Sequence, residues 1–298
     1  MDLAVLGLGG HSVFMEVDAF HRPGETVSAR SIYAEPGGKG YNQAVAARRL
    51  GADVCFIGAM GQDSEAIACT AFLESEQILP CIQTIPDAHT AYACILTDAQ
   101  GENRVTVYSG AADHLSPEFV RAHEEQIAQS RMLLLNHECP AEANQAAAAI
   151  AQAHHIPILI NPAPIRASHE CLLRNAWLLT PNLQEACTLL NLPETADESA
   201  FNKAAVALGF TRMVITLGKN GALVIEDGKS IRLPALSCRS VDTTGAGDCF
   251  TAALAVALLD DAHLKEAAEF AILASGTSVQ KRHVMPSLPF RHDLIRMI

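Results

Sequence analysis

Short runs of apolar residues alternate with Ala-rich segments of helical pattern along most of this chain. The apolar runs occupy residues 3–6, 54–57, 132–135, 158–160, 177–179 and 213–215. The helical segments include residues 43–50, 141–154, 246–259 and 264–279. Strands that are apolar throughout are typical of a parallel sheet covered on both faces, because neither face then meets water. The pattern predicts a three-layer α/β/α fold around a central, mostly parallel sheet.

Two other parts of the chain alternate apolar and polar residues, which is typical of strands with one wet face. Residues 14–17 and 26–33 flank a turn at 21–24, and residues 95–97 and 104–108 form a hairpin. We expect these strands, from about residues 12–35 and 91–110, to form a small β lid over a site. A last hairpin at 224–233 is expected to close one edge of the main sheet. The whole chain, residues 1–298, is then predicted to be a single domain.

Charge and hydropathy exclude several classes of function. The formal net charge is −12 with no run of Lys or Arg, so the chain is a poor partner for nucleic acid or an anionic membrane. No apolar run approaches the roughly 18 residues that cross a bilayer, and no signal peptide is visible, so we expect a cytoplasmic protein. The nine cysteines are scattered without a Cys-x-x-Cys pair, which indicates reduced thiols rather than a metal centre.

Two glycine-rich segments match phosphate-binding loops only in part. Residues 7–12 lack the third glycine of a dinucleotide-binding loop, and they do not lead into a helix. Residues 37–40 contain Lys39, but no Ser or Thr follows it as a Walker loop requires. Neither segment therefore predicts a nucleotide site by itself.

The most specific segment reads VDTTGAGDCF at residues 241–250 and leads directly into an apolar helix. Glycines at the start of a helix let several backbone N–H groups converge on one anion, which the helix dipole also favours. Asp248 lies within this nest, where a carboxylate can take a proton from a hydroxyl during phosphoryl transfer. An ordinary capped turn is the alternative, and it accounts for the full ten-residue string less well than an anion site does.

This segment, together with PGGKGYNQA at residues 36–44, closely resembles the two signatures of the ribokinase-like (PfkB) carbohydrate kinase family. Four further segments resemble ribokinase-like sequences in the same order, and they lie at residues 23–27, 161–164, 180–186 and 215–218. The resemblance spans residues 3–289. It implies ATP-dependent transfer of the γ-phosphoryl group to a hydroxyl, of the primary 5-OH type, on ribose or a related pentose.

The resemblance also implies a role for individual residues. Asp248 is the expected base, and the anion hole is formed by Gly245, Ala246 and Gly247. The expected sugar-binding residues are Gly10, Ser12, Gly38, Lys39, Tyr41, Asn42, Glu138 and Asp248. The expected ATP-binding residues are Asn182, Glu185, Thr216, Gly218, Gly221 and Gly247. Asn182 and Glu185 would also organise Mg²⁺ through water. A monovalent cation, K⁺, would lie near Asp242, Thr244, Ser278, Lys281, His283 and Ser287.

Two departures from the family pattern concern the acceptor. Gly10 and Ser12 stand where ribokinases carry an Asn-x-Asp that grips the sugar hydroxyls, and a hydroxyl cannot replace the charge-assisted bonds of a carboxylate. Tyr41 stands where a small residue is usual, and its ring could stack on a sugar face or narrow the pocket. A nucleoside, deoxyribose or ketohexose kinase of the same fold therefore remains an alternative acceptor class.

Two classes of protein other than enzymes fit the sequence less well. A catalytically silent binding protein should have lost the base or the anion hole, yet Asp248, Gly245 and Gly247 are all present. A transcriptional regulator would need a helix-turn-helix or a basic face, and neither is visible. The expected ligands are ATP and a small sugar. Exposed apolar residues on the lid, such as Phe14, Val17 and Ile32, favour a homodimer that pairs two lids.

Overall fold

The computed structural model describes residues 1–295 of the 298-residue chain. Its main sheet has nine strands in the order β13-β12-β11-β10-β9-β8-β1-β4-β5. Their bounds are β1 Leu3–Leu6, β4 Val54–Gly61, β5 Leu79–Ile85, β8 Met132–Asn136, β9 Ile158–Asn161, β10 Leu178–Leu179, β11 Arg212–Thr216, β12 Ala222–Glu226 and β13 Lys229–Leu233. Neighbouring strands are parallel from β5 to β11, and β12 and β13 run antiparallel at one edge. The expected edge hairpin is therefore confirmed.

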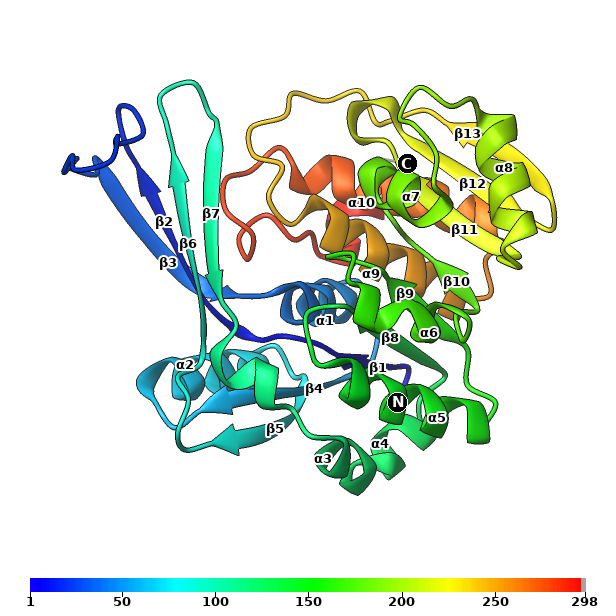
Figure 1. Cartoon of the computed structure of the whole chain (residues 1–298), viewed down its shortest axis with the longest axis horizontal. Helices are drawn as coiled ribbons and strands as arrows, with labels where there is room; N and C mark the ends of the chain where they lie inside the picture. Colours follow the sequence, from blue (N-terminus) through cyan, green and yellow to red (C-terminus); the bar gives the residue numbers. More distant parts are fainter. Residues whose placement is uncertain (296–298) are drawn as a thin grey trace.

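Helices cover both faces of this sheet (Figure 1). On one face lie α1 Lys39–Arg49, α2 Ser64–Ser75, α9 Ala246–Leu259 and α10 Leu264–Ser278. On the other lie α3 Pro117–Ala122, α4 Glu124–Ala128, α5 Ala141–Ala153, α6 Glu170–Leu173, α7 Leu183–Leu190 and α8 Glu198–Ala207. Each face of the sheet has its own hydrophobic core. Leu3 and Val5 of β1 pack in the core under α1, α2, α9 and α10, and Ala4 and Leu6 pack in the core on the other face. Burial on both sides explains why the central strands are apolar throughout, and the predicted three-layer α/β/α fold is confirmed.

The predicted lid is a separate four-stranded sheet in the order β3-β2-β6-β7. Its strands are β2 Gly10–Glu16, β3 Ser31–Gly37, β6 Ala91–Thr97 and β7 Asn103–Tyr108. Figure 1 shows it projecting from one end of the main body. The hairpin expected near residues 95–108 is present, whereas the strand expected at residues 26–33 begins only at Ser31. Pairing explains this shift, because Glu16 of β2 is paired with Ser31 and residues 26–30 have no partner strand among the described residues.

Helix α1 begins at Lys39, four residues earlier than the expected start at residue 43. Its N-cap is Gly38, with a φ of 107° that favours glycine. Gly7, just after β1, lies so close that a Cβ on it would be 2.7 Å from the Cα of Gly40. This close approach brings the first turn of α1 to the end of β1. No helix within residues 1–295 is long and apolar enough to span a membrane.

Candidate active site

Helix α9 begins in an open anion-binding turn. Its N-cap, Gly245, has a φ of 75°, in the left-handed region that favours glycine. A Cβ added at Gly247 would meet no atom within 4 Å, so the space in front of the helix is not filled by side chains. Within residues 1–295, the N–H groups of Gly247 and Asp248 have no protein acceptor. These free donors and the dipole of a 14-residue helix form a site that favours an anion.

The carboxylate of Asp248 lies in the first turn of the same helix and is 6% exposed. Its Oδ2 accepts a hydrogen bond from Asn42 Nδ2 at 2.8 Å, and its Oδ1 accepts one from Gln43 Nε2 at 3.2 Å. Burial raises the pKa of Asp248, while Lys39 and these two hydrogen bonds oppose the rise. A carboxylate with a raised pKa beside an anion site is suited to accept a proton from a hydroxyl.

A buried amide network, which the sequence analysis missed, supports this carboxylate. Gln43 Nε2 also lies 3.2 Å from Asn161 Oδ1, and Asn136 Nδ2 donates to Gln43 Oε1 at 3.4 Å. Asn161 Nδ2 donates in turn to the carbonyl of Thr180 at 2.7 Å. Asn136 and Asn161 are the last residues of β8 and β9, so a polar residue ending an apolar run was the available signal.

Asn42 leaves one acceptor free next to Asp248, the candidate base. Its Nδ2 is used by Asp248, while its Oδ1 is buried without a hydrogen-bond partner in the described part of the chain. Buried polar atoms are rarely left unpaired, and an exception marks a place where a ligand or water can bind. The free oxygen of Asn42 is thus a candidate partner for a substrate hydroxyl.

Lys39 and Glu138 complete a group of charged side chains around Asp248. The N–H of Lys39 donates to Glu138 Oε2 at 2.7 Å, which joins the start of α1 to the segment after β8. Burial raises the pKa of Glu138 to about 7, and Lys39 opposes that rise. The pKa of Lys39 is raised, chiefly by the charge of Asp248. Two carboxylates and one ammonium thus interact at the carboxyl end of the sheet.

Asn182 and Glu185 form the start of α7. Asn182 Oδ1 accepts from the N–H of Glu185 at 2.9 Å, and Glu185 Oε2 accepts from the N–H of Asn182 at 2.8 Å. This capping box shows that the polar start of the helix has a structural role. Burial raises the pKa of Glu185, and the charges of Lys39 and Asp248 also act on it. The pair therefore faces the same site as the candidate base, and its oxygens are ligands of the kind that Mg²⁺ and its waters prefer.

The expected nucleotide loop follows β11. Thr216 ends that strand and forms an isolated bridge with Asn182, so the loop lies beside the start of α7. Gly218 begins a short 3-10 helix, and a Cβ on it would meet nothing within 4 Å. Gly221 has a φ of 87°, and a Cβ there would lie 1.9 Å from the carbonyl oxygen of Leu233. Only glycine fits at that position, so the loop is packed tightly onto residues 233–235.

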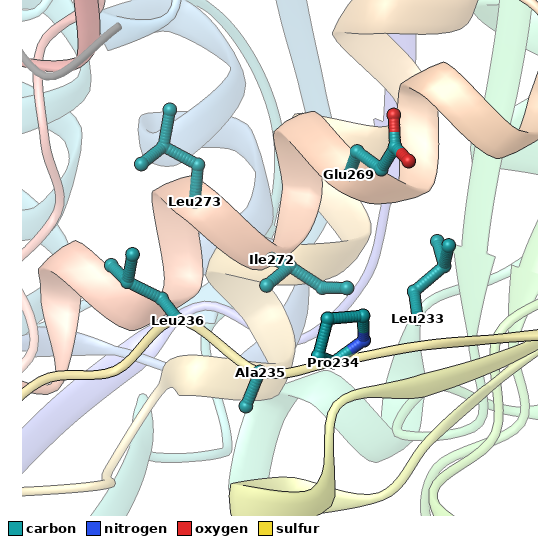
Figure 2. A pocket seen from close by; sticks show the side chains of 7 residues that line it. All are labelled: Leu233, Pro234, Ala235, Leu236, Glu269, Ile272 and Leu273. Carbon is teal, nitrogen blue, oxygen red and sulfur yellow. The ribbon is translucent and has the colours of Figure 1, made fainter.

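An apolar cavity of about 270 Å³ lies next to this loop. Figure 2 shows residues 233–236 running alongside α10, with the side chains of Pro234 and Ile272 close together. The lining residues are Leu233, Pro234, Ala235, Leu236, Glu269, Ile272 and Leu273. No sequence pattern marks these residues, because apolar residues that line a cavity have the same pattern as those of a core.

The segment around Asp242 packs against the loop between α10 and α11 Arg291–Ile295, which we call the C-terminal loop (residues 279–290). Asp242 Oδ2 accepts from the N–H of His283 at 2.9 Å, and Oδ1 accepts from the hydroxyl of Thr244 at 2.7 Å. Ser278 and Ser287 are buried, and Lys281 is exposed. The two parts of the expected cation site are therefore adjacent.

Carboxylate and carbonyl oxygens suit an alkali cation rather than a thiophilic metal. Residues 1–295 contain no group of three His, Cys, Asp or Glu that could hold a metal ion.

Comparison with known proteins decides the family. The model of the pfkB family carbohydrate kinases matches residues 8–291. The chain belongs to the pfkB family. Ribokinase of Haemophilus influenzae is 37% identical over 99% of this chain and 98% of its own length. Ribokinase of Bacillus subtilis is 33% identical over 100% of this chain and 99% of its own. This pfkB family kinase is therefore a phosphotransferase with a sugar hydroxyl as acceptor, which confirms the expected class of enzyme.

Solved structures show the same fold. Ribokinase from Thermotoga maritima superposes with a TM-score of 0.89 at 28% identity, covering 99% of this chain and 98% of that one. Ribokinase from Arabidopsis thaliana, solved with ribose and ATP, superposes with a TM-score of 0.88 at 26% identity, covering 99% of this chain and 98% of that one. Two sheets in this arrangement, a large one and a lid, are thus common to this kinase and these ribokinases.

The two departures from the family pattern have different structural outcomes. A Cβ on Gly10 would lie 2.3 Å from the carbonyl oxygen of Ala91, so β2 and β6 leave no room for an Asn in this kinase. Ser12 Oγ lies 2.4 Å from where a Cβ on Gly37 would be, so the hydroxyl points toward the glycines before α1. The small residues at 10 and 12 therefore fit a local packing in which the strand and the glycine turn approach closely.

The proposed contact of Tyr41 with a sugar is wrong for this structure. The side chain is 0% exposed, and its hydroxyl donates to the carbonyl of Cys69 at 2.7 Å. Its ring packs against Phe56 and Phe72, with centroid distances of 5.6 Å and 6.4 Å. Because α1 begins at Lys39, residue 41 points into the core while residue 42 points toward Asp248. Tyr41 is a core residue that anchors α1 to α2.

Proposed function

We propose that this kinase transfers the γ-phosphoryl group of ATP to the primary 5-hydroxyl of ribose or a closely related pentose. The observation that carries the proposal is the buried Asp248 carboxylate directly beneath the open, donor-rich start of α9. The full-length similarity to proteins named ribokinase, one of them solved with ribose and ATP, supports a pentose as the acceptor.

In the proposed reaction, Asp248 accepts the proton of the attacking hydroxyl. The anion hole expected at Gly245, Ala246 and Gly247 would stabilise the charge on the phosphoryl group as it moves. Its free donors among the described residues are the N–H groups of Gly247 and Asp248, because the N–H of Ala246 donates to the carbonyl of Thr243 at 3.2 Å. Asn182 and Glu185 would hold Mg²⁺ through water, and the ion would supply positive charge to the phosphates of ATP. Burial keeps the carboxylate basic enough to accept a proton, because desolvation disfavours its charged form.

The sugar would lie between the lid and the first turn of α1. Asn42 Oδ1 is a free buried acceptor, and Glu138 provides a second acceptor that lies beside the backbone of Lys39. The Lys39 ammonium balances part of the negative charge of Asp248 and Glu138. Gly38 and Ser12 would face the sugar from the turn and from β2. Gly10, which lies against the carbonyl of Ala91, would let β2 approach β6 closely beside the sugar.

ATP would extend from the anion hole along the loop of residues 216–221. Thr216 and Gly218 lie at the open end of this loop, and Gly221 packs it onto residues 233–235. Those residues also line the apolar cavity of about 270 Å³ in Figure 2, which is suited to the flat base of the nucleotide.

Two further features belong to this proposal. A K⁺ ion would be held by oxygens of Asp242, Thr244 and the C-terminal loop, where it would stabilise the turn that leads into α9. Of the three lid residues expected to be exposed, Ile32 is 68% exposed, but Phe14 and Val17 are buried at 8% and 3% exposure, so the expectation is wrong for those two. Two lids would still pair in a homodimer, because the lid exposes other apolar side chains such as Val105 and Tyr108, which are 59% and 53% exposed. We place the protein in the cytoplasm, where ATP is available.

The experiment is a turnover assay of the purified protein with MgATP, with and without K⁺, on ribose, 2-deoxyribose, fructose and adenosine. We expect ribose or 2-deoxyribose to give the highest kcat/KM, with K⁺ increasing the rate. Robust phosphorylation of adenosine without turnover of either pentose would contradict the proposed acceptor. Light scattering at micromolar concentration checks the dimer, which a monomeric mass would contradict.

A further inference from the structure

A buried carboxylate on the lid, Glu35 of β3, joins the lid to the C-terminal loop. Its Oε1 accepts a hydrogen bond from the N–H of Val284 at 2.8 Å, and its Oε2 accepts one from the N–H of Met285 at 2.9 Å. The side chain is 4% exposed. Removing a carboxylate from water is costly, and these two charge-assisted hydrogen bonds offset that cost. Glu35 is therefore a strong, specific link between two parts of the fold.

The segment that Glu35 holds also forms one wall of the anion hole. Val284 Cγ1 lies 2.6 Å from where a Cβ on Gly245 would be, so this valine packs directly on the N-cap of α9. The N–H of His283 donates to Asp242 Oδ2, and Asp242 Oδ1 accepts from the N–H of Thr244 at 2.9 Å. Residues 283 and 284 thus support the turn of residues 242–245, from which the anion-binding helix begins.

On its other side, Glu35 lies next to the proposed sugar site. Ser12 of β2 is paired directly with Glu35 across the lid sheet. Strand β3 ends at Gly37, and α1 begins at Lys39. Only four positions along the chain therefore separate Glu35 from Lys39, and its two hydrogen bonds join that segment to the support of the anion hole.

Two other contacts between the lid and the C-terminal loop are more open to solvent. Glu16 of β2 pairs with Arg282, and their side chains are 42% and 65% exposed. The rings of Tyr33 and His283 stack with a centroid distance of 3.9 Å. An exposed ion pair contributes little to stability or geometry. Glu16 is therefore a matched control for Glu35, because it is also a lid carboxylate that contacts the same loop.

We propose that Glu35 is a positioning residue that fixes the lid and the start of α1 relative to the anion-hole turn. The inference rests on the proposed function, since it assigns the two connected segments to the sugar and the phosphoryl group. Reacting groups that are displaced by a fraction of an ångström lose rate more than affinity. Loss of Glu35 therefore lowers kcat, while the sugar and ATP still bind.

The kinetic test compares Glu35→Ala, Glu35→Gln and Glu16→Gln in the full-length protein. We expect Glu35→Ala to lower kcat by about tenfold or more, with KM for ribose and ATP within about threefold of the unmodified protein. Glu35→Gln keeps one acceptor oxygen and should recover part of the loss, and Glu16→Gln should leave kcat within about twofold. A folded Glu35→Ala variant with unchanged kcat, or one in which only KM rises, would overturn the proposal.

A second readout does not depend on turnover. Amide hydrogen exchange in the substrate-free protein should be faster in Glu35→Ala at Val284 and Met285, and also at Thr244 on the anion-hole turn. Glu16→Gln should leave all three amides protected. Faster exchange confined to Val284 and Met285 would refute the connection to the anion hole. If the unmodified protein phosphorylates no sugar, the proposed function fails, and the exchange at Thr244 still decides whether Glu35 holds that turn.

Discussion

Asn42 and Asp248 join the two helices that meet at the candidate active site. Asn42 Nδ2, in the first turns of α1, donates to Asp248 Oδ2 at the start of α9 at 2.8 Å. The other oxygen of the Asn42 amide is buried and without a partner in the described structure. One side chain can thus hold the base and present an acceptor to the substrate.

Asn42→Ala tests this double role. We expect the sugar KM to rise because an acceptor is lost, and kcat to fall because the Asp248 carboxylate is no longer held. Each change should be about fivefold to tenfold, since losing a hydrogen bond costs about 1–1.5 kcal/mol. Steady-state kinetics with ribose and ATP measure both. Asn144→Ala, which removes a buried Asn that donates to the carbonyl of Asn136, is the control for general loss of stability. Unchanged kinetics in Asn42→Ala would contradict the role.

Alanine substitutions at Gly245 and Gly247 are a matched pair of variants that test the proposed anion hole. Gly245→Ala meets Val284 Cγ1 at 2.6 Å and forces alanine to a φ of 75°, so we expect a loss of about 1–3 kcal/mol in the free energy of unfolding. Gly247→Ala meets no atom within 4 Å, so stability should change by less than about 1 kcal/mol. Its methyl group would nevertheless lie where the phosphoryl group is expected, and kcat should fall. Denaturation and kinetics on both variants give the comparison. A fully active Gly247→Ala enzyme would contradict the location of the anion hole.

The raised pKa of Glu138 predicts how the free energy of unfolding depends on pH. Its folded-state pKa of about 7 lies above its ordinary value of 4.5, so the folded protein holds this proton more tightly than the unfolded chain. Ionisation of this carboxyl therefore does not affect the free energy of unfolding below about pH 4.5. It lowers the free energy of unfolding as the pH rises from about 4.5 through 7. We expect Glu138→Gln to increase the free energy of unfolding by on the order of 1–3 kcal/mol at pH 8 and to have little effect near pH 4.5.

The same variant should raise the sugar KM, since a neutral amide replaces the carboxylate. Urea denaturation at several pH values measures the stability, and Glu142→Gln, an exposed carboxylate on α5, is the control. A stability difference that does not change with pH would contradict the assignment of the shift to Glu138.

Tyr41→Phe distinguishes a core residue from a sugar platform. It removes the hydroxyl that donates to the carbonyl of Cys69 and keeps the ring between Phe56 and Phe72. We expect a loss of about 0.5–1.5 kcal/mol in the free energy of unfolding, with an unchanged sugar KM. A sugar KM that rises severalfold at unchanged stability would restore the stacking role.

Much of the main fold followed from the sequence because its signals are local. Residues 132–135 and 158–160 are apolar on both faces of their strands, which only a covered sheet allows. The ten residues 241–250 likewise contain both the glycines and the carboxylate of the proposed anion hole. Such features depend on residues that are neighbours in sequence, so a pattern can predict them.

Features that depend on distant partners could not be predicted in the same way. Residues 26–30 alternate like a strand, but pairing with β2 begins only at Ser31. The direction of Tyr41 depends on where α1 begins, which the contact between Gly7 and Gly40 determines. Gln43 and Asn161 are 118 positions apart, and no local pattern shows that they meet beside Asp248.

Asp248 is the proposed base that removes the proton from the sugar hydroxyl beside the start of α9. Asp248→Asn keeps the size of the side chain and removes its basicity. The most direct measurement is single-turnover phosphorylation of ribose by this variant, together with ATP binding by calorimetry. We predict a fall in the rate by a factor of about 10²–10⁴ with ATP affinity within about threefold. A variant that retains most of its phosphorylation rate would show that Asp248 is not the base.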